Sequence, residues 1–383
     1  MKKGRQLLCF FISVLCFCTA PISAINPLAS HAAEIVDSGT CGKDAVWQLD
    51  SDGTLTVSGT GAMYNISSQY TIPWADEKEL IKKAVISEGI TNVGNQAFDG
   101  CKNLTDVTIA DSVLTLNDSA FSGCSALASV VIPSSVTRIG VFAFALCSSL
   151  TDITIPESVS SIGSLAFSGT PWLENEMERE PFVIINHILI FGRDMENADI
   201  PSGVTYIVSN AFWGHTEMQT LNIPDSVTGI EYNAFSGCSN LHSVILPASV
   251  KDLGMQAFVD CASLEEVTFY NLRCRIYDRK NTIANDNKTY SGVIRGYDKS
   301  TADVYAAKYG YRFESLGTAP GDFNADGDLT VADAVLLARF LAEDDTLSHA
   351  EIDEILNGKP DRSNDGMLTV SDLSIFLNEM IAL

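Results

Sequence analysis

The stretch CSSLTDITIPESVSSIGSLAF, Cys147–Phe167, is one unit of a sequence repeat that decides the fold. A second unit, CSNLHSVILPASVKDLGMQAF at Cys238–Phe258, has the same residue order. The dipeptide Ala-Phe recurs every 23 residues, with one longer step of 45, and ends at Phe98, Phe121, Phe144, Phe167, Phe212, Phe235 and Phe258. A fixed period of this length indicates a solenoid of stacked coils.

The inside of each unit predicts how the coils pack. Leu150, Ile153 and Ile155 follow the alternation of a short strand, and Pro156 then ends the strand because proline cannot donate to a ladder. One unit cannot bury its apolar face alone, so neighbouring coils must stack. This Cys-x-x-Leu, Ile-Pro and Ala-Phe layout resembles the BspA-like leucine-rich repeats over residues 84–270, and the resemblance implies a β-rich solenoid that serves as an interaction surface.

Both ends of the repeats carry sequences typical of caps. We expect an N-terminal β cap over 33–83, with a hairpin that turns at Asp52-Gly53, and a β/α cap over 271–316, with a helix between Ser300 and Gly310. The longer repeat step predicts a β-hairpin inserted at 169–199, with His187 as a solvated residue at its turn. Residues 317–320 are expected to form a linker.

The N-terminus and the charge indicate a secreted protein. Residues 1–32 combine three cations with a short apolar run, Leu7–Thr19, which predicts a signal peptide cleaved at Ala24 or Ala32; an uncleaved anchor is the alternative. The formal net charge of −24 repels phosphate backbones and anionic membranes, which argues against nucleic-acid binding and membrane insertion. We therefore expect a soluble extracellular protein.

Five of the ten cysteines occupy one repeat position, three residues after the phenylalanine: Cys101, Cys124, Cys147, Cys238 and Cys261. Thr170 and His215 fill the same position in the other two units, so it is a packing position, and we expect buried, reduced thiols. Stacked thiols could still come within disulfide range. Cys41 and Cys274 belong to opposite caps and are expected to lie too far apart to pair. A single file of thiols does not predict a tetrahedral zinc site.

An acidic motif occurs twice at the C-terminus, as GDFNADGDLTVADAVLLARFL at Gly321–Leu341 and PDRSNDGMLTVSDLSIFL at Pro360–Leu377. The spacing is that of an EF-hand calcium loop, in which alternate oxygen donors converge and a glycine at the sixth position allows the bend. We predict two Ca²⁺ ions. The expected ligands are Asp322, Asn324, Asp326, Asp328, Thr330 and Asp333 in the first loop and Asp361, Ser363, Asp365, Met367, Thr369 and Asp372 in the second.

A helix follows each loop and a further one is expected near Ser348–Leu356, whereas no helix precedes either loop. Residues 321–383 therefore resemble a type I dockerin, a small all-α calcium-binding module. The resemblance implies binding to the cohesin module of a scaffoldin and attachment to a cell-surface cellulosome. Its expected cohesin-binding residues are Val331, Ala332, Ala338, Arg339, Val370, Ser371, Leu377 and Asn378. Because the loop positions are nearly symmetric, two docking poses are conceivable, although the helix positions differ.

No catalytic motif accompanies these modules: neither H-E-x-x-H nor G-x-S-x-G occurs in the chain. The strands should present a polar surface in two rows, one of Asp106, Ser129, Asp152, Thr220, Ser243 and Glu266, the other of Thr108, Val131, Thr154, Asn222, Ile245 and Thr268. Trp47, Trp74, Trp172 and Trp213 are expected to pack internally. We favour a non-catalytic cellulosomal protein whose repeats recognise a protein or a glycan. The alternatives are a plant cell-wall polysaccharide-degrading factor with an unrecognised site and a repeat-based peptidase inhibitor or regulator.

Overall fold

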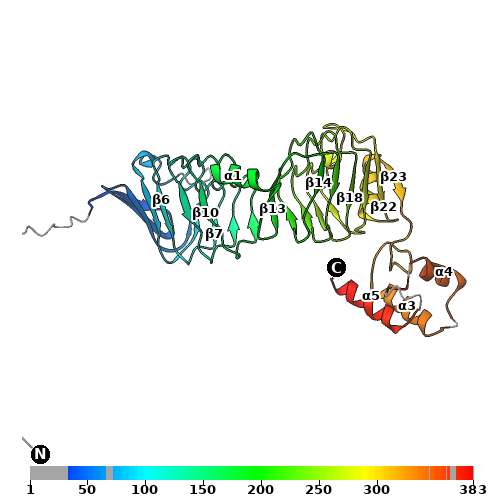
Figure 1. Cartoon of the computed structure of the whole chain (residues 1–383). Coiled ribbons are helices and arrows are strands. Elements are labelled where there is room, and N and C mark those ends of the chain that lie inside the picture. The colour runs from blue at the N-terminus through cyan, green and yellow to red at the C-terminus, as the bar shows by residue number, and fades with distance from the viewer. Residues whose placement is uncertain (1–32, 66–71, 345, 359, 363–367, 383) are drawn as a thin grey trace, which may run out of the picture.

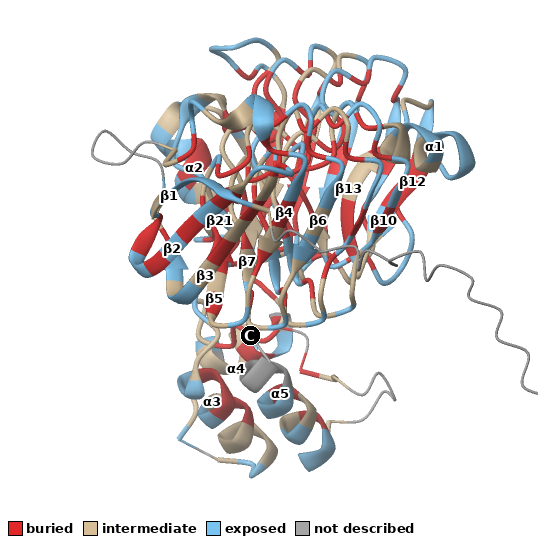
Figure 2. Cartoon of the chain, turned by 90° about the vertical axis from the view of Figure 1, so that its left-hand side faces the viewer, coloured by how far each residue is buried: buried red, intermediate tan, exposed pale blue. Residues whose placement is uncertain are grey.

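The computed structural model describes residues 33–65, 72–344, 346–358, 360–362 and 368–382, so the predicted signal peptide lies outside the described residues. The repeats form an elongated solenoid, and a small helical module follows at its C-terminal end (Figure 1). Buried side chains fill the interior of the solenoid, and exposed ones follow its outer faces (Figure 2). This arrangement confirms the stacked-coil prediction. Among the described residues no helix is long and apolar enough to cross a membrane.

Two ladders of parallel strands run along the solenoid. The first ladder, hereafter the strand ladder, contains β4 (Lys83–Ile86), β6 (Asp106–Ile109), β8 (Ser129–Val131), β10 (Asp152–Thr154), β14 (Asn197–Asp199), β16 (Thr220–Asn222), β18 (Ser243–Leu246), β20 (Glu266–Phe269) and β22 (Val293–Gly296). The second ladder contains β5 (Ile90–Val93), β7 (Thr115–Leu116), β9 (Arg138–Ile139), β11 (Ser161–Ile162), β13 (Ile188–Gly192), β15 (Tyr206–Ile207), β17 (Gly229–Ile230), β19 (Asp252–Leu253) and β21 (Arg275–Ile276). Residues pair at the 23-residue period, for example Ser129 with Asp152.

The repeat phenylalanines stack inside the third side of each coil. Ring centroids of Phe98, Phe121 and Phe144 are 5.2 and 5.4 Å apart with nearly parallel planes. All seven repeat phenylalanines are buried. In every one of these coils the residues two before and two after the phenylalanine have positive φ, which lets the chain turn tightly around the ring. Glycine occupies the second of these positions in five coils, because it adopts this conformation without steric cost.

Each end of the solenoid has a cap. At the N-terminus β1 (Ile35–Thr40), β2 (Gly42–Asp50) and β3 (Thr54–Met63) form an antiparallel sheet, and β3 starts the parallel ladders; the short helix η1 (Lys78–Leu80) follows. At the C-terminus η2 (Lys280–Thr282), α2 (Thr301–Tyr309) and β23 (Arg312–Ser315) cover the last coil. Ser300 caps α2, and Gly310 ends it with φ of 71°.

The insertion contains more than a hairpin. The helix α1 (Pro171–Arg179) precedes β12 (Phe182–Ile185), which pairs with β13 through a turn at Asn186 and His187. The hairpin prediction omitted α1, although Thr170 caps it and proline stands at its first turn. His187 is exposed, with its Nδ1 3.0 Å from the Gly203 carbonyl oxygen. The insertion interrupts the ring stack, because Trp172 packs edge-on against Phe167 and Phe182 packs edge-on against Phe212.

The thiols of the repeat position point into the solenoid. Cys124 and Cys147 donate from Sγ to the Phe98 and Phe121 carbonyls of the preceding coil, at 3.2 and 3.1 Å. All seven described cysteines are buried and free. Burial raises the pKa of the Cys101 thiol to about 12, so the thiol stays protonated. His215 holds the same position in its coil, where burial lowers its pKa.

The described part of the C-terminal module contains α3 (Val331–Leu341), α4 (His349–Asn357) and α5 (Val370–Ala382). Because α4 lies before the second loop, the expectation that no helix precedes either loop was wrong for that loop. The core of the module is separate from that of the solenoid and consists of Phe323, Ala334, Leu337, Ile355 and Phe376. The Phe323 and Phe376 rings meet edge-on at 5.1 Å. Among the described residues of the module, these five buried side chains make a thin core, as is usual for a domain of this size.

Substitution of Leu146 by glycine should stabilise the solenoid. Leu146 has φ of 60° and is 65% exposed, so its side chain bears the steric cost of the left-handed conformation and contributes little burial. We expect Leu146→Gly to raise the free energy of unfolding by about 0.5–1 kcal/mol in denaturant titrations. Leu146→Ala is the control, since it shortens the side chain but keeps the strain. A gain in Ala equal to that in Gly would contradict the conformational explanation.

Acidification should weaken the coil that contains His215. Its folded-state pKa lies below that of the unfolded chain, so protonation favours unfolding, and its stabilising effect is lost as pH falls below about 6.5. We expect His215→Cys to reduce the drop in Tm between pH 7 and pH 5. The exposed His242→Cys serves as control and should leave that drop unchanged. An unaltered pH profile in His215→Cys would exclude this residue as the cause.

Candidate functional site

In the first acidic loop, side-chain oxygens accept hydrogen bonds from backbone amides of the same loop. Asp322 is 2% exposed, and its two carboxylate oxygens accept from the Asp326 and Gly327 amides at 3.1 and 2.9 Å. The Asn324 side-chain oxygen also accepts from the Asp326 amide, at 2.9 Å. Gly327, at the sixth position, has φ of 90°, which explains why glycine stands there. The loop therefore turns its first, third and fifth side chains toward the same segment of backbone.

Asp333 closes this loop from the first turn of α3. It is fully buried, and one oxygen accepts from the Phe323 and Asn324 amides at 2.8 and 3.2 Å. The other accepts from the Thr330 amide at 2.7 Å and completes a capping box at the helix start. One carboxylate thus joins both ends of the loop to the helix.

The second loop repeats this arrangement 39 residues later. Asp372 is fully buried and accepts from the Arg362 and Thr369 amides at 2.9 and 2.7 Å. Thr369 in turn accepts from the Ser371 amide at 3.1 Å, as Thr330 does from Ala332 at 3.2 Å. Asp361, the predicted first ligand, is half-buried. Ser363, Asp365 and Met367 lie outside the described residues.

The donor chemistry of the first loop suits a hard cation. Burial raises the pKa of Asp322, and the nearby charges of Asp333 and Asp326 raise it further. The raised pKa shows that the folded loop brings negative charges together at a site with little water. Oxygen donors at this spacing are what Ca²⁺ prefers. Among the described residues, no three His, Cys, Asp or Glu side chains converge closely enough to form a finished metal site. The fit therefore rests on the oxygen donors and on the uncompensated charge.

The predicted cohesin-binding residues fall into two groups. Val331 and Val370 begin α3 and α5 and are 69% and 72% exposed, and Ala332 and Ser371 beside them are exposed as well. On the helices, Leu377 and Asn378 are exposed, whereas Ala338 and Arg339 are only half-exposed. Arg339 is held by Asp344 at 2.8 Å. The exposed apolar residues at the two helix starts are therefore equivalent, while the helix positions differ.

The module contacts the last part of the solenoid through its first loop. Arg273 forms an ion pair with Asp328, and the Lys299 ammonium donates to the Ala325 carbonyl. Both cations precede the linker, and both partners belong to the loop. At the seventh position of an EF-hand-type loop the ligand is the backbone carbonyl, which leaves the Asp328 side chain available for this contact.

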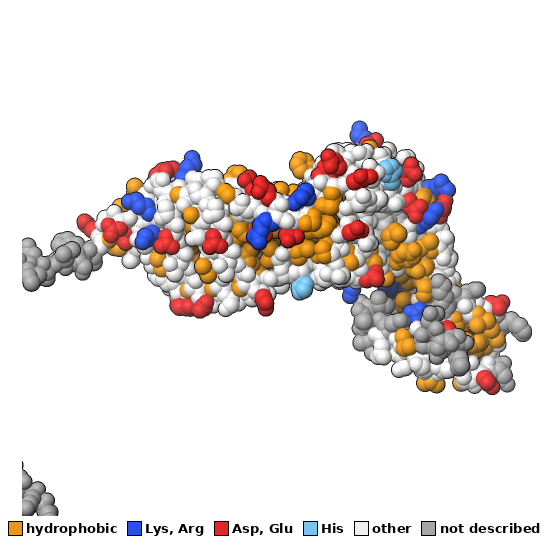
Figure 3. Space-filling model, viewed as in Figure 1, with side chains coloured by type: hydrophobic (Ala, Val, Ile, Leu, Met, Phe, Trp, Pro, Cys, Tyr) orange, Lys and Arg blue, Asp and Glu red, His pale blue; other side chains and the backbone are white. Residues whose placement is uncertain are grey.

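The strand ladder presents the predicted polar row. Asp106, Ser129, Asp152, Thr220 and Ser243 are exposed, and Glu266 is half-exposed and bound to Arg295 at 3.2 Å. The first row also includes Asn197, which pairs with Thr220, and the second row includes Asp199, which pairs with Asn222; counting back 23 residues would have found both. Thr268 was wrongly placed on the exposed surface, since it is buried beside β22. On the face in Figure 3, acidic side chains are scattered along the solenoid and hydrophobic ones gather near its middle.

The tryptophans are not all internal. Trp47 and Trp74 are buried and Trp172 packs on Phe167, as predicted for packing residues. Trp213 is 64% exposed, so that expectation was wrong. It follows a repeat phenylalanine directly, at a position that is buried in three other coils, at Ala145, Ser236 and Val259.

Comparisons with known proteins agree with the solenoid. A family model described as BspA type leucine rich repeat region matches six copies, over residues 76–181 and 183–279, which together exceed half of the chain. Among solved structures, a leucine-rich repeat protein from Eubacterium ventriosum is 22% identical, covers 74% of this chain and 85% of its own, and has a TM-score of 0.43. A leucine rich cell surface protein from Faecalibacterium prausnitzii is 19% identical, with coverages of 61% and 88% and a TM-score of 0.28. No match was found among curated proteins.

Loss of the buried carboxylate of Asp333 should unfold the first loop. Asp333→Ala leaves the Phe323, Asn324 and Thr330 amides without their acceptor, at a cost of about 2–3 kcal/mol to the module. We expect faster hydrogen exchange over residues 321–341 with the solenoid unaffected. Asp328→Ala is the matched control, with calcium present for both variants, because this side chain is exposed and only the Asp328 carbonyl is proposed to bind the ion. Equal exchange rates in the two variants would contradict a structural role for Asp333.

Proposed function

The chain belongs to the BspA-type leucine-rich-repeat family, and from this premise we propose that it is a secreted, non-catalytic recognition protein whose C-terminal module docks onto a cohesin of a scaffoldin in a calcium-dependent way. One observation carries the docking proposal: Asp333 and Asp372 make the same hydrogen bonds 39 residues apart. A duplicated loop and helix with this spacing is the type I dockerin pattern. Docking would attach the protein to a cell-surface cellulosome.

Two Ca²⁺ ions belong to the proposal, and the oxygens of both loops would hold them. In the first loop these are the oxygens of Asp322, Asn324, Asp326, Thr330 and Asp333 with the Asp328 carbonyl. In the second they are those of Asp361, Ser363, Asp365, Thr369 and Asp372 with the Met367 carbonyl. When bound, calcium would supply the positive charge that compensates the buried carboxylates, and its binding would add to the stability of a module with a thin core.

The repeats would supply recognition. Exposed side chains recur at one coil spacing along the strand ladder, so a long ligand could contact several coils in register. The polar row Asp106, Ser129, Asp152, Asn197, Thr220 and Ser243 offers hydroxyl, amide and carboxylate groups in single file. Such a surface suits a protein or a cell-wall glycan. The matched family is a repeat family and not a catalytic one, which favours binding over turnover.

Binding of the protein to a panel of cohesins, measured with calcium and with excess chelator, tests this function. We expect binding in calcium and its loss in chelator, because the loops require the ion to fold. If both docking poses occur, Val331→Asp or Val370→Asp alone should weaken binding less than about tenfold, and the double variant by more than about 100-fold. Val304→Asp, another highly exposed valine, is the control. Tight binding retained in chelator would overturn the proposal, and loss in one single variant would leave only one pose.

A further inference from the structure

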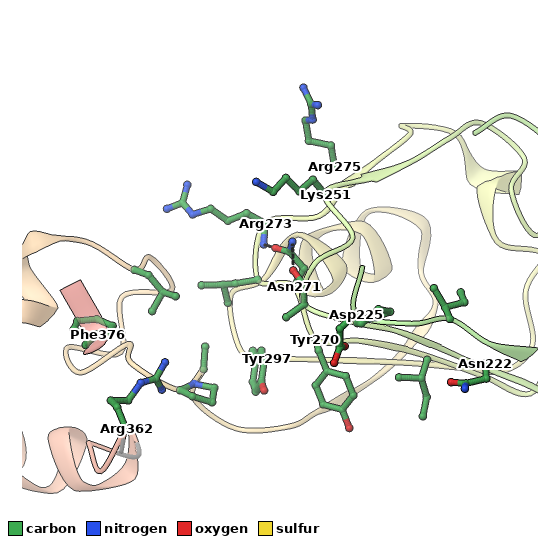
Figure 4. A pocket seen from close by; sticks show the side chains of 18 residues that line it. Asn222, Asp225, Lys251, Tyr270, Asn271, Arg273, Arg275, Tyr297, Arg362 and Phe376 are labelled. Carbon is green, nitrogen blue, oxygen red and sulfur yellow. Dashed lines mark hydrogen bonds between the residues drawn. The ribbon is translucent and has the colours of Figure 1, made fainter. Parts of the chain in front are cut away.

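Positive charge is concentrated near the end of the solenoid. Residues 251–316 carry ten Lys and Arg against nine Asp and Glu, whereas residues 33–250 carry eight against 25. Four cations, Lys251, Arg273, Arg275 and Arg362, line a groove of about 1090 Å³ between the last coils and the C-terminal module (Figure 4). Of the described residues lining it, only Asp225 is acidic. The lining of this groove, hereafter the basic groove, therefore holds more cations than acids in a chain of net charge −24, although Arg273 and Arg275 pair with Asp328 and Asp252 beside it.

The cations of the basic groove are arranged by the coil spacing. The Arg275 amide donates to the Lys251 carbonyl at 2.7 Å, so these residues stand on neighbouring coils, about 4.8 Å apart along the solenoid. Arg275 pairs with Asp252 at 2.6 Å, but the arginine side chain is 78% exposed. Exposed ion pairs contribute little stability, and an arginine keeps further donors in such a pair. Lys251 and Arg275 can therefore bind an external carboxylate at low cost.

Two tyrosines add flat apolar surface to the groove. Tyr270 follows β20 and Tyr297 follows β22, and their ring centroids are 6.4 Å apart at 56°. Tyr270 is 42% exposed. Ile245, Pro247 and Leu272 extend the apolar lining. The groove is therefore lined by cations on one side of Asn271 and by ring faces on the other (Figure 4), which suits an extended ligand whose units each combine a carboxylate with an apolar ring face.

We propose that the basic groove binds an acidic polysaccharide built from uronic acids. Each uronate couples one carboxylate to a sugar ring with an apolar face, and cations one coil apart can meet carboxylates of one chain. At physiological ionic strength, fields are screened within about 8 Å, so the acidic repeats farther away do not prevent such binding. The lining does not include the residues proposed to contact cohesin, so the two proposals are independent.

Calorimetric titration of the full chain with short oligogalacturonates, calcium present throughout, tests this inference. We expect Lys251→Ala/Arg275→Ala to weaken binding at least tenfold and Tyr270→Ala to weaken it by a similar factor. The matched controls are Lys43→Ala/Lys102→Ala, two exposed cations outside the groove, and Tyr277→Ala, an exposed tyrosine outside it. These controls should bind as the unaltered protein does.

Two ligand comparisons distinguish the sources of binding. Methyl-esterified oligogalacturonates keep the rings and lose the charge, and we expect them to bind at least tenfold more weakly. Polyglutamate tests an acidic peptide as occupant, and dextran sulfate tests unspecific attraction of anions. Binding of either as tight as that of the uronate, unchanged affinity in Lys251→Ala/Arg275→Ala, or no binding by the unaltered protein would each overturn the proposal.

Discussion

Every coil of this protein depends on the next coil to bury its apolar face. The repeat phenylalanine fits against the ring 23 residues away, and the thiols donate to the carbonyl of the preceding coil. A buried ring and a satisfied backbone are therefore achieved only by stacking. The constraint also fixes the outside of the molecule, because side chains that alternate with the buried ones must form rows at one coil spacing.

The C-terminal module does not bury its side chains by stacking repeated coils. Among its described residues the core contains few large side chains, and two buried carboxylates accept backbone amides of their own loops. Asp333 and Asp372 make equivalent hydrogen bonds in their loops, and an exposed valine begins the helix that follows each loop. The ion pair of Arg273 with Asp328 shows the solenoid's last cations facing the module's acidic surface. The two parts are thus complementary in charge at this contact.

The sequence predicted what depends on period and spacing. The 23-residue step located the strands and the single repeat position shared by Cys124, Thr170 and His215, because one packing environment recurs in every coil. It missed α1, since Thr170 serves at once as a core residue and as a helix cap. It placed Thr268 outside because the strand that covers it, β22, belongs to a cap without the repeat pattern. The basic groove was unpredictable, because its residues come from coils, cap and module that meet only in the folded chain.

The interrupted ring stack has a mechanical consequence. Rings from Phe98 to Phe167 form one continuous column and rings from Phe212 to Phe258 another, with edge-on contacts at Trp172 and Phe182 between them. The seam is held instead by the edge-on contacts and by the Asn186 side chain, which donates to the Pro156 and Val159 carbonyls. A pull along the long axis is therefore expected to part the two columns at this seam before it unstacks the rings within either column.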